Sequence, residues 1–296
     1  MTIETFQQSL PHGITLSCRA AGERGRPVLM FLHGFPEAAF VWDELLEHFG
    51  KQGFRAVAPN LRGFEKSSQP DDVQQYRAKH ILQDIAALIA IEGSPLECLI
   101  AHDWGGAIAW NLANQRPELT QRLMIVNSPH PGTFLRELQR SAKQQAASAY
   151  MNFLIRDDAA KLLREGDYRR LFGFFKEHGG EKWLTDSVKQ QYREVWDASL
   201  QGGLNYYRAS PLRPARDGDS AAAAVTLPRE MLTVSIPTFV LWALLDDALC
   251  PELVDGLDEY IPRLTLERVP DATHWIVHER PQFVAARLAG FLAANQ

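Results

Sequence analysis

The chain alternates between short apolar runs and longer amphipathic stretches, except in its middle third. Apolar runs bounded by glycine, proline or polar turn residues predict strands buried on both faces of a sheet. Such runs lie at residues 27–32, 54–59, 96–101, 123–127, 238–242 and 264–269, and two weaker strand-like runs lie before residue 30. Helix-period stretches lie near residues 40–52, 76–91 and 104–114. This alternation predicts an α/β protein with a mostly parallel sheet and helices on both faces.

The middle of the chain has a different pattern. Between residues 131 and 228 the strand-like runs stop, and helix-period segments rich in aromatic residues take their place. We interpret this region as an inserted helical cap. The predicted division is an α/β core at residues 1–130, the cap at residues 131–228 and the second part of the core at residues 229–296. Residues 211–220 have the weakest pattern and are expected to form a mobile return linker.

Composition narrows the range of functions. The 296 residues are 46% hydrophobic and 23% charged, which is typical of a globular protein. The formal charge is −5 and the lysines and arginines are scattered, so neither nucleic acid nor a membrane surface is an expected partner. The N-terminal segment does not resemble a secretory signal and no run has membrane-spanning length, which predicts a cytoplasmic protein. The three cysteines lie far apart without zinc-ligand spacing, so we expect neither disulfides nor a metal site.

A strand-to-helix junction carries the first candidate catalytic residue. Asp103 follows the predicted strand at residues 96–101, and small residues, Ala101 and Gly105, lie two positions before and after it. This pattern is typical of a nucleophile elbow, a tight turn that tolerates small neighbours and projects its middle side chain above the sheet. The alternative is that Asp103 only caps the following helix, since aspartate is a preferred N-cap residue.

A second loop supplies candidate hydrogen-bond donors. The segment HGFP begins at His33, directly after the strand predicted at residues 27–32. Gly34 permits a turn that aims the Phe35 N–H into the site, where it would join the Trp104 N–H as an oxyanion hole. Taken alone, the segment is equally compatible with a simple turn. Its position one strand–helix unit before the elbow favours the oxyanion hole.

Candidates for an acid and a base follow the last two predicted strands. Asp246 lies in the loop after the strand at residues 238–242, and His274 lies in the loop after the strand at residues 264–269. Nucleophile, acid and histidine therefore occur in the chain order of α/β-hydrolases. We predict a catalytic triad of Asp103, Asp246 and His274.

Two neighbouring residues are rivals for these roles. Asp247 is adjacent to Asp246, and because adjacent side chains point to different sides, one of them is expected to face the histidine and the other the solvent. His278 lies one helical turn after His274. We favour His274 because it lies in a loop at the end of a strand.

Together these motifs resemble those of the α/β-hydrolase epoxide hydrolases, in the branch that also holds the haloalkane dehalogenases. The similarity runs from about residue 10 to the end and rests on HGFPE at 33–37, HDWGG at 102–106 and HW at 274–275. It implies an α/β-hydrolase fold with a mostly parallel eight-stranded sheet, an inserted helical cap and no cofactor. The chain departs from the family pattern at Ala101, often a glycine, and at residues 243–245, where glycine and polar residues are more usual.

The resemblance also assigns residues in the cap. Tyr150 and Tyr207 look like the pair of ring-opening tyrosines of this family, and the segment around Tyr207 is the stronger match. Tyr206, Tyr168 and Tyr192 are rivals for these positions. Packing between cap and core is an equally favoured role for Tyr150.

An apolar cavity is expected beneath the cap. Its expected substrate-binding residues are His33, Phe35, Trp104, His130 and Trp275. His130 lies where the chain leaves the sheet for the cap, and a structural or hinge role is the favoured alternative for it.

An aspartate nucleophile restricts the substrate class. Its attack on an ester or amide would give a reactive anhydride, whereas its attack on an sp³ carbon gives an ester that activated water can cleave. Asp103 therefore predicts an epoxide hydrolase, which forms a vicinal diol through an alkyl-enzyme ester that water activated by His274 cleaves. The expected partners are a small apolar epoxide and water, and a homodimer is compatible with the sequence.

Other functions remain open. A haloalkane dehalogenase would use the same Asp103, with the Trp104 indole and a second donor such as Trp183 or Trp196 binding the halide. A fluoroacetate dehalogenase would place an arginine after the nucleophile, where this chain has Trp104. A non-catalytic ligand-binding homologue would keep the fold without the reaction, although a complete triad argues against it.

Overall fold

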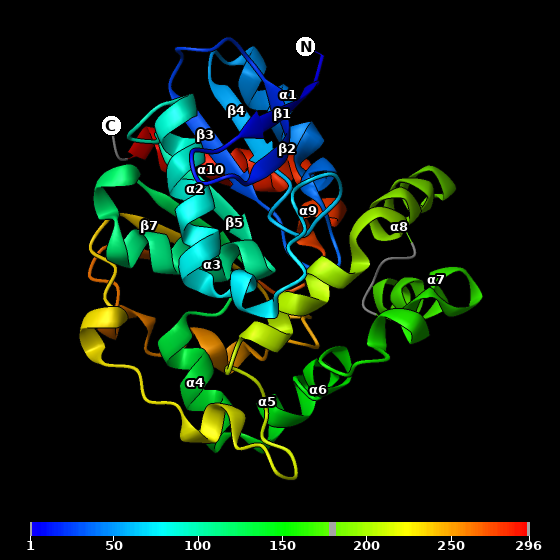
Figure 1. Cartoon of the computed structure of the whole chain (residues 1–296). Coiled ribbons are helices and arrows are strands. Elements are labelled where there is room, and N and C mark those ends of the chain that lie inside the picture. The colour runs from blue at the N-terminus through cyan, green and yellow to red at the C-terminus, as the bar shows by residue number, and fades with distance from the viewer. Residues whose placement is uncertain (1, 178–181, 295–296) are drawn as a thin grey trace.

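The computed structural model describes residues 2–177 and 182–294 and contains an eight-stranded sheet (Figure 1). The strands lie in the order β1-β2-β4-β3-β5-β6-β7-β8. Strand β2 pairs antiparallel with β1 and β4, and the other neighbours pair in parallel. The strands are β1 Glu4–Ser9, β2 Thr15–Ala21, β3 Val28–Leu32, β4 Arg55–Pro59, β5 Cys98–His102, β6 Leu123–Val126, β7 Thr238–Ala243 and β8 Leu264–Val269. The mostly parallel sheet predicted from the apolar runs is confirmed.

The burial of each strand matches its place in the sheet. Every residue of β3 to β7 is buried, because these strands have neighbours on both sides and helices on both faces. The edge strands β1 and β8 keep partly exposed residues along their length. The uniformly apolar runs in the sequence are therefore the central strands, and the more polar runs are the edges.

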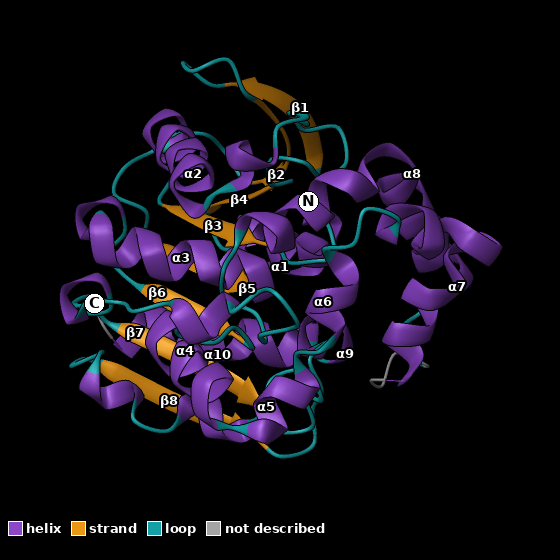
Figure 2. Cartoon of the chain, turned by 60° about the horizontal axis from the view of Figure 1, so that its bottom comes forward, coloured by secondary structure: helices purple, strands orange, loops and turns teal. Residues whose placement is uncertain are grey.

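Helices cover both faces of the sheet (Figure 2). Helices α2 and α3 pack together on one face, and α1 and α10 pack together on the other. The bounds are α1 Asp43–Lys51, α2 Ala78–Glu92, α3 Asp103–Gln115, α9 Ile276–Glu279 and α10 Pro281–Ala294. The helix predicted near residues 76–91 is preceded by a short 3₁₀ helix at Val73–Tyr76, because Arg77 adopts an extended conformation between them.

Most of the chain between β6 and β7 is helical. Its helices are α4 Pro131–Arg140, α5 Ala142–Ala147, α6 Tyr150–Leu154, α7 Ala159–Glu177 and α8 Asp186–Ala209. Across the described residues of this segment, 131–177 and 182–228, the structure contains no strand. We propose that residues 131–228 form the cap. No helix in the described ranges has both the length and the apolar character needed to cross a membrane.

Helix α8 contacts the core closely at Ser199 and Gly202. The Glu65 N–H donates a hydrogen bond to Ser199 Oγ at 2.6 Å, at the point where Ser199 interrupts the helix. Three residues later, Gly202 packs directly on Gly63: a Cβ on Gly202 would lie 2.1 Å from the Gly63 carbonyl oxygen. Only glycine permits this approach of one backbone to another.

We expect the substitution Gly202→Ala to destabilise the protein by about 1–3 kcal/mol, because the added methyl group overpacks a backbone contact that cannot rotate away. Chemical denaturation measures this free energy of unfolding. Gly173→Ala is the matched control, since nothing lies within 4 Å of its Cβ and alanine is favoured in a helix. Equal stabilities for the two variants would contradict the close contact.

Candidate active site

Asp103 lies at the sharp turn between β5 and α3. Its φ is +47°, in the left-handed region that few residues other than glycine, asparagine and aspartate adopt. A Cβ on Gly105 would lie 2.4 Å from the Leu32 carbonyl oxygen, so a small residue is required there. Ser128 Oγ donates a hydrogen bond to the Asp103 carbonyl oxygen at 2.7 Å. The N-cap of α3 is His102, so the turn has the geometry of a nucleophile elbow rather than of an aspartate cap.

Two backbone N–H groups hold the carboxylate of Asp103. The Phe35 N–H donates to Oδ1 at 2.8 Å, and the Trp104 N–H is a second donor. Gly34 makes room for this contact, since a Cβ there would lie 2.2 Å from Oδ1. Burial raises the pKa of the Asp103 carboxyl group, and the nearby histidines and the two N–H groups only partly offset this effect. The structure thus brings both predicted oxyanion-hole donors to the predicted nucleophile.

Asp246 is buried and hydrogen-bonded through both oxygens in the loop after β7. Its Oδ1 accepts from the N–H groups of Ala248 and Leu249, each at 2.9 Å. Its Oδ2 accepts from Asn127 Nδ2 at 2.9 Å and lies 2.6 Å from His274 Nδ1. Burial would raise the pKa of Asp246, but the charge of His274 and these hydrogen bonds outweigh it and lower the pKa. The group therefore carries a negative charge beside the histidine.

His274 lies between two carboxylates. Its Nδ1 faces Asp246, and its Nε2 lies 4.0 Å from Asp103 Oδ2, which is too far for a hydrogen bond. Burial opposes a positive charge on the ring, but Asp246 and then Asp103 outweigh this effect and raise the pKa of His274 to about 9. Of the two rivals, Asp247 is exposed and His278 binds elsewhere. Geometry therefore favours Asp246 and His274 as the acid and the base.

The raised pKa of His274 predicts a pH dependence of stability. Because the pKa of about 9 in the folded protein exceeds the ordinary value of 6.5, the charged ring stabilises the native state fully below pH 6.5. This contribution is lost as the pH rises through about 9. We expect the melting temperature of the protein to fall toward that of His274→Gln across this range. Thermal unfolding of both proteins tests this, and a difference that stays constant or widens with rising pH would contradict it.

A second buried contact between a histidine and a carboxylate lies behind His274. His102 places Nδ1 2.8 Å from Glu37 Oε2 and Nε2 3.0 Å from the carbonyl oxygen of His274. The other oxygen of Glu37 lies 3.3 Å from His278 Nε2, which is 2.7 Å from the hydroxyl group of Tyr192. Burial opposes the charge of Glu37, but the two histidines outweigh it and hold its pKa well below the usual range. This buried histidine network holds the backbone at His274 and connects the core to α8.

Tyr150 and Tyr207 reach the site from α6 and α8. The centroid of the Tyr207 ring lies 5.0 Å from that of Trp104, 5.5 Å from that of Phe35 and 6.2 Å from that of Tyr150. Hydrogen bonding connects the two phenols with each other and the Trp104 side chain with Tyr207. Burial above all, with a contribution from the Asp103 carboxylate, raises the pKa of both phenols well above their ordinary value. Both hydroxyl groups therefore keep their protons at neutral pH.

The hydroxyl groups of the three rival tyrosines are engaged elsewhere. Tyr206 donates a hydrogen bond to the Arg62 carbonyl oxygen at 2.8 Å. Tyr168 donates to the carboxylate of Asp197. Tyr192 belongs to the buried histidine network. The ring of Tyr206 lines the cavity, but its proton is used to hold α8 on the core.

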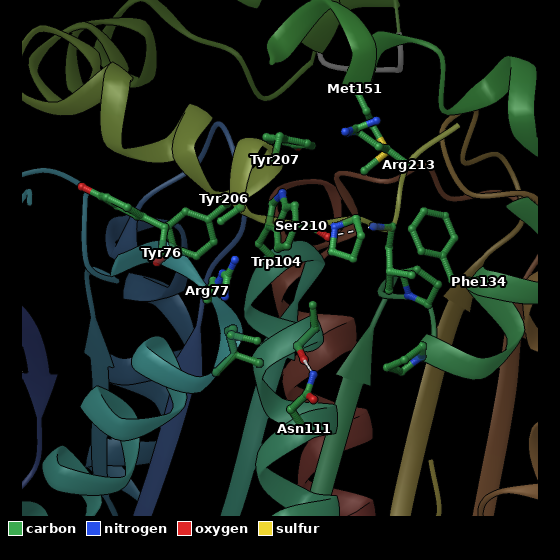
Figure 3. Close-up of a pocket in the computed structure, with 18 of the residues that line it drawn as sticks. Tyr76, Arg77, Trp104, Asn111, Phe134, Met151, Tyr206, Tyr207, Ser210 and Arg213 are labelled. Carbon is green, nitrogen blue, oxygen red and sulfur yellow. Dashed lines mark hydrogen bonds between the residues drawn. The ribbon is translucent and has the colours of Figure 1, made fainter. Parts of the chain in front are cut away.

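Asp103, Tyr150 and Tyr207 line one cavity of about 680 Å³. Figure 3 shows this cavity with Tyr207 and Trp104 among its labelled residues. This volume is in the range of small-molecule sites. The apolar part of its wall includes Trp104, Ile108, Phe134, Met151, Leu212 and Leu227. The cavity lies between the strand ends of the core and the helices of the cap, as Figure 3 shows. Residues 208–213 line it, so the first three residues of the expected return linker, 211–213, form part of the wall.

Four of the residues expected to bind substrate do not line this cavity, and among the predicted set only Trp104 does so. Phe35 contributes its N–H, while its ring packs on Tyr207. His33 accepts a hydrogen bond from a backbone N–H at 3.1 Å, and His130 binds a backbone carbonyl oxygen at 2.8 Å. Trp275 is fully buried among aromatic rings. These side chains support the site from behind, because the backbone occupies their polar atoms or the core encloses them.

Two kinds of supporting residue were not assigned from the sequence. Asn127 accepts a hydrogen bond from the Ala243 N–H at 2.9 Å and donates to Asp246, which connects the end of β6 to the acid loop. The other kind is Glu37 and His102, which belong to the motifs HGFPE and HDWGG. The sequence feature that could have indicated their role is that each is an ionisable residue in a segment that is otherwise expected to be buried. Within residues 2–177 and 182–294, no group of three or more His, Cys, Asp or Glu side chains is placed to hold a metal.

Comparison with known proteins agrees with this geometry. The sequence profile described as the alpha/beta hydrolase fold matches residues 27–281. The Bacillus subtilis AB hydrolase superfamily protein YfhM is 31% identical over 95% of each chain, and human epoxide hydrolase 4 is 31% identical over 95% of this chain and 76% of its own. The crystal structure of Bacillus megaterium epoxide hydrolase in complex with an inhibitor gives a TM-score of 0.86 at 30% identity, covering 97% of this chain and 100% of that one. An epoxide hydrolase from metagenomes of hot environments gives a TM-score of 0.85 at 37% identity over 99% of each chain.

The sheet order, the elbow and the matched profile define an enzyme of the α/β-hydrolase fold. Within that fold, the chain belongs to the epoxide hydrolase family. Enzymes of this family are hydrolases that act on ether bonds without a cofactor. The fold and the resemblance inferred from the motifs are therefore confirmed.

Proposed function

We propose that this protein hydrolyses epoxides to vicinal diols through a covalent ester on Asp103. The observation that carries the proposal is the placement of two protonated phenols, Tyr150 and Tyr207, in the same cavity as a buried carboxylate nucleophile. A carboxylate attacks an sp³ carbon productively, and an epoxide oxygen needs a proton donor as it leaves. The two features together match the requirements of ring opening.

In the first step, Asp103 Oδ2 attacks an epoxide carbon. Oδ2 is the suitable atom because Oδ1 is held by the Phe35 N–H. The ring C–O bond breaks, and a phenol of Tyr150 or Tyr207 gives its proton to the emerging alkoxide, which is much more basic than a phenolate. Oδ1 becomes the carbonyl oxygen of the ester and stays in contact with the two N–H groups.

In the second step, His274 removes a proton from water, and the water oxygen attacks the ester carbon of Asp103. The tetrahedral oxyanion forms on Oδ1, where the N–H groups of Phe35 and Trp104 stabilise it. Its collapse breaks the bond to the alkyl oxygen, which takes the proton held by His274 and leaves as the second hydroxyl group of the diol. The carboxyl proton left on Asp103 returns to the tyrosine phenolate, so that Asp103, His274 and the phenol are all restored. Esterification also removes the Asp103 charge, one of the influences that raise the pKa of His274, so the ring becomes a more available base when it is needed.

The haloalkane dehalogenase alternative has less support. Neither of the tryptophans expected as a second halide donor lines the cavity. Trp196 Nε1 donates to the Pro36 carbonyl oxygen at 2.7 Å, and Trp183 stacks on His278 with the ring centroids 4.0 Å apart. A non-catalytic role is also disfavoured. A buried pair of charged groups such as Asp246 and His274 usually stabilises a fold no better than an apolar pair of similar size, so stability alone does not explain it.

The tyrosines provide the test of this function. We expect the wild-type protein to convert styrene oxide to its diol, and the double variant Tyr150→Phe/Tyr207→Phe to lose at least about 10²-fold in kcat/KM, because general acid catalysis contributes 10²–10⁴-fold. Each single variant should lose less, since one phenol remains. Product analysis by chiral chromatography measures the diol.

Two controls accompany this test. Tyr206→Phe removes a hydroxyl group that is bonded to the core and so reports the cost of removing a phenol that faces a backbone carbonyl rather than the substrate. Release of bromide from n-butyl bromide needs no proton donor and reports the dehalogenase alternative. If the double variant kept wild-type epoxide turnover, or if only bromide were released, the proposed function would be wrong.

A further inference from the structure

The charged side chains on the cavity wall are of one sign, apart from the nucleophile. Arg77, Lys79, Arg208 and Arg213 line the cavity, and Asp103 is the one carboxylate among its described lining residues. This excess of positive charge stands out because the whole chain carries a formal charge of −5. A concave site lined by one sign of charge concentrates ligands of the opposite sign.

Two of these four side chains, Arg208 and Arg213, already form hydrogen bonds with other parts of the protein. Arg213 donates to the Asp219 carboxylate at 2.6 Å, so its charge is paired. Arg208 donates to the Arg156 carbonyl oxygen at 2.7 Å and to Asn205 Oδ1 at 3.0 Å, which ties α8 to the turn after α6. Arg213 Nε and Nη1 are buried without a hydrogen-bond partner, but the Asp219 carboxylate offsets the charge of this side chain, and Arg208 is held by backbone and amide oxygens.

Arg77 and Lys79 are differently placed. Both are exposed, and in the described part of the chain neither forms an ion pair. They lie at the start of α2, whose N-terminal end adds a partial positive charge. Figure 3 shows Arg77 on one side of the cavity near Tyr76, with Trp104 between it and Arg213 on the other side. The two unpaired cations therefore mark one rim of the cavity.

The Asp103 carboxylate limits where an anionic group can lie. A second negative charge near the nucleophile would be repelled and would also disfavour the ionised form of Asp103. The lining is mostly apolar, with Asn111, Ser128 and Ser210 among its neutral polar side chains, so the exposed rim cations are the strongest partners for a charged group. An anionic substrate is consequently oriented in one way, with its charged group at the rim and its neutral epoxide at Asp103.

We propose that the cavity takes epoxides bearing an anionic oxygen group, a carboxylate or a phosphate, which Arg77 and Lys79 bind at the rim while an apolar spacer reaches Asp103. The inference rests on the proposed epoxide hydrolysis and specifies its substrate class. The anionic group takes no part in ring opening, so Arg77 and Lys79 bind it equally strongly in the ground state and in the transition state. This contact therefore acts on KM and on the rate of capture rather than on kcat.

A matched set of substrates tests this inference. An ω-epoxyalkanoate, the corresponding primary amide and an ω-epoxyalkyl phosphate share one spacer and one epoxide and differ only in the terminal group. With wild-type protein we expect kcat/KM for at least one anion to exceed that for the amide by about tenfold, the scale of one charge-assisted contact. Added salt should reduce this ratio, because it screens exposed charges.

The variant Arg77→Gln/Lys79→Gln should bring the ratio of anion to amide close to one, mainly through a higher KM for the anion. Turnover of the amide by the same preparation reports that the variant is folded. Lys51→Gln, which removes an exposed cation from α1 on the opposite face of the sheet, is the matched control and should keep the wild-type ratio. Preference for the carboxylate or for the phosphate identifies which anion the rim accepts.

Several results would overturn the inference: an amide that is hydrolysed as well as both anions, or a ratio that survives in the double variant or is insensitive to salt. A separate measurement keeps the proposed function distinguishable. Calorimetric binding of a plain alkanoate without an epoxide should be weakened in Arg77→Gln/Lys79→Gln even if the protein turned over no epoxide. If the wild-type protein turned over no epoxide but bound the alkanoate more tightly than the double variant, the proposed function would be contradicted and the anionic rim supported. Equal alkanoate binding by the wild type and the double variant would contradict the rim.

Discussion

Asp103→Ala is expected to abolish epoxide turnover, with a loss in kcat of roughly 10⁴-fold or more, the scale found when a covalent nucleophile is removed. The loss is large because the methyl group of alanine leaves no atom to form the ester, while the oxyanion-hole donors then have no oxygen to hold. Diol formation from styrene oxide, followed to high enzyme concentration, measures the residual rate. Normal steady-state turnover by this variant would contradict the mechanism.

Two controls separate chemistry from folding in this experiment. Alanine adopts the left-handed φ of +47° at position 103 less readily than aspartate, so the melting temperature of Asp103→Ala must be recorded beside its activity. Asp247→Ala removes the exposed carboxylate next to the acid of the triad and should keep most of the activity. A similar loss in Asp247→Ala would mean that the acid had been assigned to the wrong residue.

The second large effect is expected from His274→Gln, which should form the ester and then stop. Alkylation needs the Asp103 carboxylate and the tyrosines, which this variant retains, whereas hydrolysis needs a base for water. Steady-state diol formation should fall by about 10²–10⁴-fold, with a single turnover of epoxide consumed. Loss of the positively charged histidine raises the pKa of Asp103 further, so the experiment belongs at neutral or alkaline pH, where the nucleophile stays ionised.

His278→Gln is the matched control for this variant. His278 is the rival histidine, but its Nε2 lies 2.7 Å from the Tyr192 hydroxyl group and its ring stacks on Trp183, away from the cavity. This substitution is expected to lower stability without leaving an ester on the protein. Accumulation of the ester in His278→Gln and not in His274→Gln would reverse the assignment of the base.

The fold was predictable from the sequence where burial is uniform. Strands β3 to β7 are buried along their whole length and mostly apolar because they are covered on both faces, and they were found at nearly their observed bounds. The boundary of β5 was misjudged by two residues at its start, since Leu96 forms only an isolated bridge with Thr120 outside the ladder. Cap boundaries, a homodimer and a cytoplasmic location stay predictions.

The positions of site residues were predictable where a residue belongs to a sequence motif whose backbone geometry is fixed. Asp103, Phe35 and Trp104 meet because the turns that carry them follow neighbouring parallel strands, β5 and β3. The sequence favoured Asp246 as the acid but left Asp247 as a rival, because which of two adjacent carboxylates faces His274 depends on the hydrogen bonds of one loop.

The lining of the cavity was the least predictable part. His33 lies two residues before Phe35 and Trp275 follows His274, both predicted site residues, yet the side chains of His33 and Trp275 are buried in the core and do not line the cavity. Arg77 reaches the rim from a segment that carries no motif, directly after the 3₁₀ helix Val73–Tyr76, which contacts α8. Sequence proximity to a catalytic residue therefore predicts position in the site poorly when the wall is built from distant segments.

The central claim is that Asp103 forms a covalent ester with an epoxide. Intact-protein mass spectrometry of His274→Gln, after separate exposure to styrene oxide and to n-butyl bromide and with the adduct mapped by peptide digestion, tests it most directly. We expect one styrene oxide adduct, located on Asp103, and no adduct from the bromide. An adduct from the bromide alone, or an epoxide adduct on any other residue, would contradict it.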